Sequence, residues 1–292
     1  TEFEIRQCRG NLDAFINKVE PKYIVPLGAV ATQSILGTKE EITKIAGKSY
    51  NWNVYIVIPL IHPSYFSYNP NKLQSYRMSF QRLKDLVYNT NKVERDFRYE
   101  LSDENKLWFN EKLNQSRKVT IDVETNWLDI FLSNSKILSI GMGSSEYEGM
   151  AVPFDDNAKA FAKTMLEDEN IGKVGHNIAF DALTLKRLCG INVKGKIDDT
   201  MVAHYLATGM VSGKQISHNL KAVSREFGIS ETEIKEIDYD KIVGLSYKEL
   251  LEYNKSDVVI TSILHNKIPK IEPIYSLLCS CIPMLVDIEA QG

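Results

Sequence analysis

Several common features are scarce or missing in this sequence. Its four cysteines (Cys8, Cys189, Cys279 and Cys281) form no CxxC pair and have no regular spacing, which argues against a disulfide framework and for a reducing compartment. No apolar run approaches the ~20 residues that span a membrane, and the first ten residues lack a signal-peptide pattern. The net charge of −3 excludes a global basic field that binds nucleic acid indiscriminately. We therefore expect a cytoplasmic protein with no membrane contact, in which any contact with nucleic acid is local.

What is present is the composition of a globular protein with room for two domains. The chain has 292 residues, of which 43% are hydrophobic and 25% charged. A polar, charge-rich stretch after residue 89 predicts a domain boundary. We predict a first domain over 1–95, a linker over 96–117, a second domain over 118–270 and a separate helix from 271 to 292. Because the chain starts without Met and ends within a helical pattern, we expect a fragment of a longer protein.

Hydrophobic periodicity predicts an α/β fold for both domains. In the first, apolar segments alternate with helical patterns, the last of them over 70–89. The second opens with three strand-like segments in quick succession, at 118–125, 136–143 and 148–154. Gly and Ser residues separate them, which suggests an antiparallel meander. Helices and short strands then alternate up to a long helix over 246–268.

Carboxylates stand at three separate places in the second domain. Asp122 and Glu124 lie on one face of the opening strand, because side chains alternate along a strand. Asp181 comes early in a helix, after a strand that ends in Asn. Tyr253 and Asp257 lie one turn apart on the long helix. Each pattern alone is weak, since Asp-x-Glu recurs at 287–289 and Tyr-x-x-x-Asp at 99–103.

Four carboxylates and a tyrosine at one point would have a chemical use. Hard divalent cations such as Mg²⁺ or Mn²⁺ take oxygen ligands, and their charge offsets the repulsion between the carboxylates. Two such ions ~3.5–4 Å apart activate a water molecule and stabilise the leaving oxygen of a phosphoryl displacement. The pattern therefore predicts a site for two divalent metal ions.

At these residues the chain resembles a known family. "DVET", "NIAFD" and "YNKSD" resemble, in that order, the three motifs of the tyrosine-containing DEDD 3′–5′ exonucleases, and the surrounding text is similar to the proofreading domain of family A DNA polymerases. The resemblance covers about residues 116 to 292, and the final "CIPMLVDIEAQG" resembles the helix where the polymerase region begins. It implies a ribonuclease H-like fold, a mixed sheet with helices on both sides, and a polymerase domain in the same polypeptide. It also implies that the protein works in a bacterial or phage-infected cell.

The resemblance also implies roles for individual residues. Asp122, Glu124 and Asp257 would hold the metal that carries the attacking water, Asp122 with Asp181 would hold the second, and Tyr253 would orient the water. Other positions match the nucleotide site: Thr125, Leu128, Asn177 and Phe180. The reaction would be hydrolysis of the last phosphodiester at the 3′ end of single-stranded or frayed DNA, with release of a nucleoside monophosphate.

Two alternatives to a DNA exonuclease stay open. RNA-trimming enzymes of the RNase D type carry the same tyrosine motif. A non-catalytic DNA-binding module would have the same fold, but the complete set of four carboxylates and Tyr253 disfavours it.

Residues 1 to 90 resemble a second family. "PKYIVPLGAVATQSILG" and "IPLIHPSYF" are similar to the C-terminal half of the uracil-DNA glycosylase superfamily, which flips its target base. The resemblance implies a smaller α/β domain in which His62 steadies the departing uracil and the Pro63–Ser64 loop presses into the opened duplex.

The departures from that family point away from a complete glycosylase. Its N-terminal half with the catalytic motif has no counterpart here, and only Cys8 matches one of its four cluster cysteines. One thiolate cannot hold an iron–sulfur cluster, so we expect none in this fragment. Two readings stay open: the missing half lies upstream of Thr1, or the domain is a relative kept for DNA guiding or packing. We favour the second.

Residues that flank the motifs have two readings. Lys186, Arg187, Lys194 and Lys196 form either a solvated face or a landing surface for the phosphate backbone of an incoming strand. Trp127 is either a packing residue or a base-stacking residue.

Overall fold

The computed structural model describes residues 2–68, 76, 79–80, 83–84, 87, 94–208, 216–229, 233–237 and 239–291. The chain forms two compact units, Thr1–Lys92 and Val93–Gly292, each described here by itself. Most of the helix expected over 70–89 lies outside the described residues, as does the side chain of Cys8.

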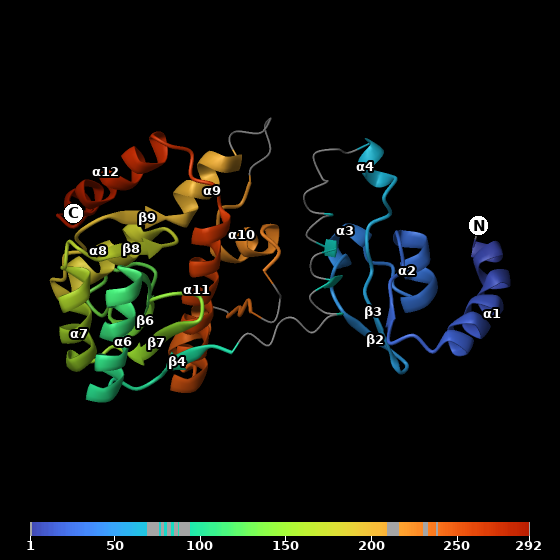
Figure 1. Ribbon diagram of the computed structural model, residues 1–292, viewed down its shortest axis with the longest axis horizontal. Coiled ribbons are helices and arrows are strands. Elements are labelled where there is room, and N and C mark those ends of the chain that lie inside the picture. Colours follow the sequence, from blue (N-terminus) through green and yellow to red (C-terminus); the bar gives the residue numbers. More distant parts are fainter. Residues whose placement is uncertain are drawn as a thin grey trace. The chain divides into compact units, whose positions relative to one another are not determined.

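The first unit is a small three-stranded sheet with short helices (Figure 1). Its strands have the order β1-β3-β2, in which β1 and β3 are parallel and β2 and β3 antiparallel. The alternation of apolar segments and helices expected from the sequence is present in the described part of this unit. The elements are α1 (Glu2–Val19), β1 (Tyr23–Ile24), α2 (Ala29–Leu36), α3 (Ile42–Ile45), β2 (Tyr50–Trp52), β3 (Tyr55–Val57) and α4 (Tyr65–Tyr68).

The second unit is built on a six-stranded mixed sheet of order β4-β7-β6-β5-β8-β9. Strands β5, β6 and β7 form the predicted antiparallel meander, and β8 and β9 extend it in parallel. The elements are β4 (Asp96–Arg98), α6 (Asp103–Ser116), β5 (Lys118–Thr125), β6 (Ile137–Gly143), β7 (Glu148–Pro153), α7 (Asp156–Leu166), β8 (Gly172–Gly175), α8 (Ile178–Cys189), β9 (Ile197–Asp199), α9 (Thr200–Thr208), α10 (Leu220–Glu226), the 3-10 helix η2 (Tyr239–Gly244), α11 (Tyr247–Lys267) and α12 (Ile274–Glu289).

The two faces of β5 point into different layers. Val119, Ile121 and Val123 are buried in the main core together with apolar side chains of α6, α7 and α8. The alternate residues, which include Asp122 and Glu124, point to the opposite face, where α11 lies across the sheet (Figure 1). The period of two along β5 thus separates the core from the carboxylates.

Small residues on β6 let α11 approach this second face. Gly141 pairs with Asp122 on the neighbouring strand. A Cβ atom at Gly141 would lie 2.6 Å from Cγ2 of Val258 and 3.0 Å from Oδ1 of Asn254, both on α11. Only a residue without a side chain leaves room for the helix at this distance.

The prediction of a linker over 96–117 is wrong. These residues form β4, which pairs in parallel with β7, and α6, whose Phe109 and Leu113 are buried in the main core. Polar residues dominate the exposed positions of α6, so its composition resembles a linker although two apolar side chains anchor it. Ser102 caps α6 by accepting the backbone N–H of Asn105.

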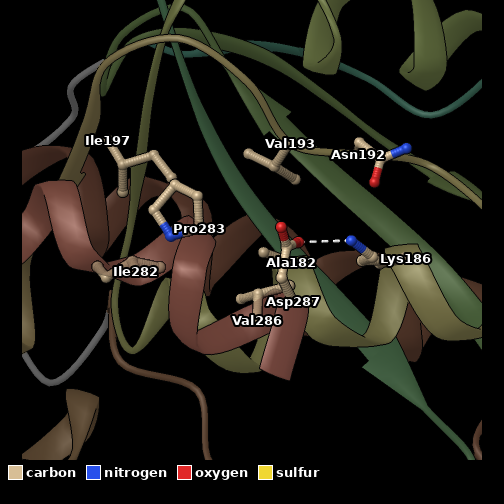
Figure 2. Close-up of a pocket in the computed structure, with 9 residues that line it drawn as sticks. All are labelled: Ala182, Lys186, Asn192, Val193, Ile197, Ile282, Pro283, Val286 and Asp287. Atoms are coloured by element: carbon tan, nitrogen blue, oxygen red, sulfur yellow. Dashed lines mark hydrogen bonds and ion pairs between the residues drawn. The ribbon is translucent and has the colours of Figure 1, made fainter. Parts of the chain in front are cut away.

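The helix expected at the end of the chain is α12, and it packs on the second unit. Tyr275, Cys279, Ile282 and Val286 recur at helical spacing and are buried. A small cavity of about 30 Å³ lies beside α12. Figure 2 shows the side chains that line it, among them Lys186 of α8 and Asp287, which form an ion pair with a distance of 2.5 Å. Among the described helices of both units, none has the length and apolarity that crossing a bilayer requires.

Candidate active site

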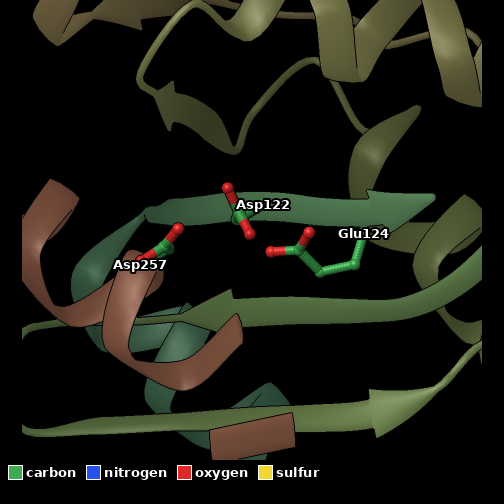
Figure 3. Close-up of side chains that lie close together, drawn as sticks. All are labelled: Asp122, Glu124 and Asp257. Atoms are coloured by element: carbon green, nitrogen blue, oxygen red, sulfur yellow. The ribbon is translucent and has the colours of Figure 1, made fainter. Parts of the chain in front are cut away.

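Three carboxylates meet on the α11 side of the sheet. Ligand oxygens of Asp122, Glu124 and Asp257 all lie within 4.8 Å of one another. Figure 3 shows the first two beside each other on β5, with Asp257 approaching from α11. Three of the four predicted carboxylates are thus brought together from segments more than 130 residues apart in the chain.

Asp181, the fourth carboxylate, is fixed next to this group. It is buried in the first turn of α8, and its Oδ1 accepts the backbone N–H of Val123 at 2.9 Å. The pairing of β5 with β8 ends at Thr120, so Asp181 takes the place of a strand partner further along β5. Asp181 lies outside the group of three, but it interacts electrostatically with Asp122 and Glu124.

Asn254 connects α11 to β5. Its Nδ2 donates to the backbone carbonyl of Asp122 at 3.1 Å and to the carboxylate of Asp122 at 2.5 Å. Asn254 is fully buried, one residue after Tyr253. Asn254 does not stand out in the sequence, because its neighbours on α11 are both polar and apolar and an amide among them is not distinctive.

Lys221 of α10 is the cation of the site. Its ammonium forms an ion pair with Asp257 and lies 4.6 Å from the centre of the Tyr253 ring. Both partners of the pair are largely buried, with side-chain exposures of 15% and 7%. No local pattern in the sequence indicates this role for Lys221, because the ion pair depends on how α10 packs against α11.

Burial and mutual repulsion shift the pKa values of the carboxylates. Burial and the charge of Asp122 raise the pKa of Glu124 and that of Asp181 well above their ordinary values. Burial also raises the pKa of Asp122, against the favourable charge of Lys221 and the hydrogen bond from Asn254. Burial lowers the pKa of Lys221 to about 8. Ionising several carboxylates in one buried place costs free energy unless further positive charge is present.

Local signals set the ends of the helices that carry these groups. Ser246 and Glu249 form a reciprocal capping box that fixes where α11 begins. Further along this helix, Tyr253 and Asp257 lie one turn apart. Asp199 accepts the backbone N–H groups of Asn177 and Ile178 at 3.1 and 2.9 Å and so holds the start of α8. Asp199, which also was not predicted as a site residue, therefore positions Asp181 through the helix.

The residues expected to line the nucleotide site lie around the carboxylates in different environments. Thr125 is fully buried, and its hydroxyl donates to the carbonyl of Trp127 at 2.7 Å. Leu128 is 64% exposed. Asn177 is exposed in a left-handed conformation with φ of 61°, and Phe180 is partly buried against the core.

In the first unit, two stretches of the glycosylase-like motif meet. Leu27 and Leu60 form a parallel bridge, and a Cβ atom on Gly28 would lie 3.0 Å from Cβ of His62. His62, Pro63 and Ser64, which form the predicted loop, are exposed. The Ser64 hydroxyl lies 2.7 Å from Nδ1 of His62, to which the Ser64 backbone N–H also donates at 3.2 Å.

Comparison with known proteins identifies both units. Residues 103–271, more than half of the chain, match the family of 3′–5′ exonucleases, and residues 1–89 match the uracil DNA glycosylase superfamily. The chain therefore belongs to the 3′–5′ exonuclease family of the kind found in family A DNA polymerases, preceded by a glycosylase-like unit.

Individual relatives agree with this division. The type-4 uracil-DNA glycosylase of Sulfurisphaera tokodaii is 35% identical over 115 residues, which are 37% of this chain and 51% of that protein. The DNA polymerase of Bacillus phage SP01 is 24% identical over 243 residues, 70% of this chain and 26% of the polymerase. The chain thus spans about half the length of the glycosylase and a quarter of the polymerase.

Solved structures show the fold. Brucella melitensis NrnC with bound Mg²⁺ has a TM-score of 0.53 at 20% identity, over 68% of this chain and 94% of that one. The predicted ribonuclease H-like fold, with a mixed sheet covered by helices on both sides, is confirmed.

The donor set fits divalent metal ions. Exonucleases of this fold use such ions, and the site offers hard oxygen ligands from three buried or half-buried carboxylates with a fourth beside them. Burial and the charge of Asp122 keep the pKa of Glu124 raised against the favourable charge of Lys221, and a bound cation would favour the ionised carboxylate.

Proposed function

We propose that this chain is a metal-dependent 3′–5′ exodeoxyribonuclease that serves as the proofreading part of a family A DNA polymerase. The observation that carries the proposal is the convergence of Asp122, Glu124 and Asp257 within 4.8 Å, with Asp181 fixed beside them. The phage polymerase relative supports DNA as the substrate.

Each residue has a part in the hydrolysis of the terminal phosphodiester. Asp122, Glu124, Asp181 and Asp257 would hold two divalent ions, Mg²⁺ or Mn²⁺. The ions would supply the positive charge that activates a water molecule and stabilises the leaving oxygen. Tyr253 orients the water through its hydroxyl. The water oxygen bonds to phosphorus, the bond from phosphorus to the 3′ oxygen breaks, and that oxygen takes up a proton, which releases a nucleoside 5′-monophosphate.

The remaining predicted residues would bind the substrate. Leu128 is exposed directly after β5 and would pack against the terminal base. Thr125, Asn177 and Phe180 would shape the nucleotide site, Thr125 by holding the turn at Trp127.

Asparagine substitutions test the assignment. Asp122→Asn and Asp181→Asn keep the size of the side chain and remove one ligand charge each. We expect either change to lower the rate of 3′-end degradation of single-stranded DNA in Mg²⁺ or Mn²⁺ by at least ~100-fold, with unchanged circular dichroism. As a matched control, Asp287→Asn alters the second Asp-x-Glu copy, which lies on α12 and pairs with Lys186. Full activity in either Asp122→Asn or Asp181→Asn would contradict the proposal.

RNA is the second candidate substrate. Trypanosoma brucei RNase D in complex with an RNA shares the fold at a TM-score of 0.50, although at only 16% identity. Degradation of DNA and RNA oligonucleotides of the same sequence separates the two: we expect DNA to be degraded faster, and a preference for RNA would favour RNA trimming.

We also propose that a polymerase domain belongs to the same polypeptide and that the enzyme is cytoplasmic. Six large apolar side chains on the outer face of α12 support the first point, since such faces mark contacts with other surfaces: Ile274, Leu277, Leu278, Met284, Leu285 and Ile288. We propose that the first unit guides DNA rather than excising uracil.

A further inference from the structure

The loop over 126–135, which follows β5, displays four large apolar side chains to solvent. They are between 45% and 64% exposed: Trp127, Leu128, Phe131 and Leu132. Single exposed apolar residues are ordinary, but a concentration of them beside a site calls for an explanation. Only Leu128 has a role so far.

The loop is held in shape by its own hydrogen bonds. The side chain of Asn126 accepts the N–H of Lys136 at 2.7 Å and donates to the carbonyl of Asn134 at 2.9 Å. The hydroxyl of Ser135 donates to the carbonyl of Asp129 at 2.8 Å, and Ile130 is buried in the main core. The apolar side chains are therefore presented on a preorganised support.

A cation completes the surface. The guanidinium carbon of Arg187, on α8, lies 4.2 Å from the centre of the Phe131 ring. Arg187 is exposed, and within the described part of the chain no carboxylate pairs with it. The nearest acid in the loop, Asp129, accepts the backbone N–H of Phe131 at 3.0 Å. An aromatic ring under an arginine offers a flat face and a positive charge, which suit a base and its phosphate.

The chain itself limits how far this surface can be from the carboxylates. Trp127 follows Glu124 by three residues, so at most ~10 Å of extended chain separates them. Arg187 follows Asp181 by six residues of helix, or about 9 Å along the axis of α8. These spans are comparable to one or two nucleotides of an extended single strand.

We propose that Trp127 and the Phe131–Arg187 pair form a stacking platform for the nucleotides that lie upstream of the 3′-terminal one. The platform binds unpaired bases by stacking and their phosphates through Arg187, without reading sequence. It is distinct from the terminal-base contact of Leu128. The inference rests on the proposed function, because that function defines the strand whose end lies at the carboxylates.

Two substrates of different length test the platform. The p-nitrophenyl ester of thymidine 5′-monophosphate has no upstream nucleotide, whereas (dT)8 has seven. We expect Trp127→Ala and Phe131→Ala each to lower the ratio of kcat/KM for (dT)8 to that for the ester by roughly tenfold. Trp127→Phe, which keeps a stacking ring, should restore most of the ratio. Leu107→Ala removes an even more exposed apolar side chain from α6 and should leave both rates as they are.

Tryptophan fluorescence gives a readout that needs no catalysis. Titration of (dT)8 in EDTA should quench the emission of the wild-type protein, and Trp127→Phe should lose most of this quenching although Trp52 and Trp108 remain. The platform would be refuted if the alanine variants left the ratio of kcat/KM values unchanged, or if quenching persisted in Trp127→Phe. In that case the exposed apolar side chains would be better explained as a surface for a protein partner. A wild-type protein that cleaves neither substrate but shows quenching from Trp127 would instead contradict the exonuclease assignment and leave the platform standing.

Discussion

Lys221 and Asp257 form a buried ion pair inside the carboxylate site, between α10 and α11. The lysine ammonium thus contacts a carboxylate that, in our proposal, is a metal ligand. It provides part of the positive charge that the metal-free site needs, since it also acts favourably on Asp122 and Glu124. The same ion pair therefore stabilises the second unit and contacts a proposed metal ligand.

Removal of this lysine should destabilise the metal-free protein. Lys221→Met leaves Asp257 buried without its partner, which we expect to cost about 3 kcal/mol of unfolding free energy in EDTA. Mn²⁺ should recover more stability in this variant than in the wild type, because it replaces the missing charge. Urea denaturation with EDTA or Mn²⁺ measures both effects. Lys235→Met breaks a more exposed pair with Glu252 and should cost less than ~1 kcal/mol. Equal losses in the two variants would contradict the role of the buried pair.

Metal should stabilise the protein more at neutral than at acidic pH. The ordinary pKa values of Glu124 and Asp181 are 4.5 and 3.8, and both are raised in the fold. The folded metal-free protein thus keeps protons that the unfolded chain has released, so its stability falls as pH rises above about 4 toward the raised values. Metal ions need the ionised carboxylates.

We therefore expect the gain in melting temperature on replacing EDTA with Mn²⁺ to be small at pH 5 and larger at pH 7.5, as measured by circular dichroism. Asp122→Asn should show a smaller gain at pH 7.5 than the wild type. The same gain at both pH values would mean that the carboxylates are already ionised without metal.

A side chain at position 141 should disturb the site from the neighbouring strand. The added Cβ of Gly141→Ala would meet Val258 at 2.6 Å, so α11 must shift and carry Tyr253 and Asp257 away from Asp122. We expect a loss of about 1–3 kcal/mol in stability and at least ~10-fold in exonuclease rate. Gly244→Ala is the matched control, since a Cβ there has no neighbour within 4 Å. Wild-type activity in Gly141→Ala would show that α11 tolerates the shift.

The glycosylase-like unit should release no uracil by itself. His62 is exposed and lies in the expected loop, but residues 1–89 supply about half the length of the type-4 relative. We expect this chain to leave a uracil-containing single strand without abasic sites, and His62→Ala to change nothing in that assay. Binding of duplex DNA, measured by fluorescence anisotropy, should fall in a Ser64→Glu variant if the loop guides DNA. Uracil release that depends on His62 would refute our preference.

Part of the site could be read from local patterns. Alternation along β5 places Asp122 and Glu124 on one face whatever surrounds the strand, and one helical turn separates Tyr253 from Asp257. The meander was also predicted correctly. The pattern alone did not distinguish Asp122-x-Glu124 from Asp287-x-Glu289. The structure distinguishes the two copies, because Asp287 lies exposed on α12 and forms an ion pair with Lys186 of α8.

The sequence by itself determined the order of the motifs, the type of fold and the four carboxylates, since these depend on residue types and on short-range periodicity. Only the tertiary structure decided that Lys221 pairs with Asp257, that Asn254 holds Asp122, and that β4 and α6 belong to the second unit. Those relationships join segments far apart in the chain. They depend on how closely helices approach the sheet, and a glycine on the neighbouring strand controls that distance for α11.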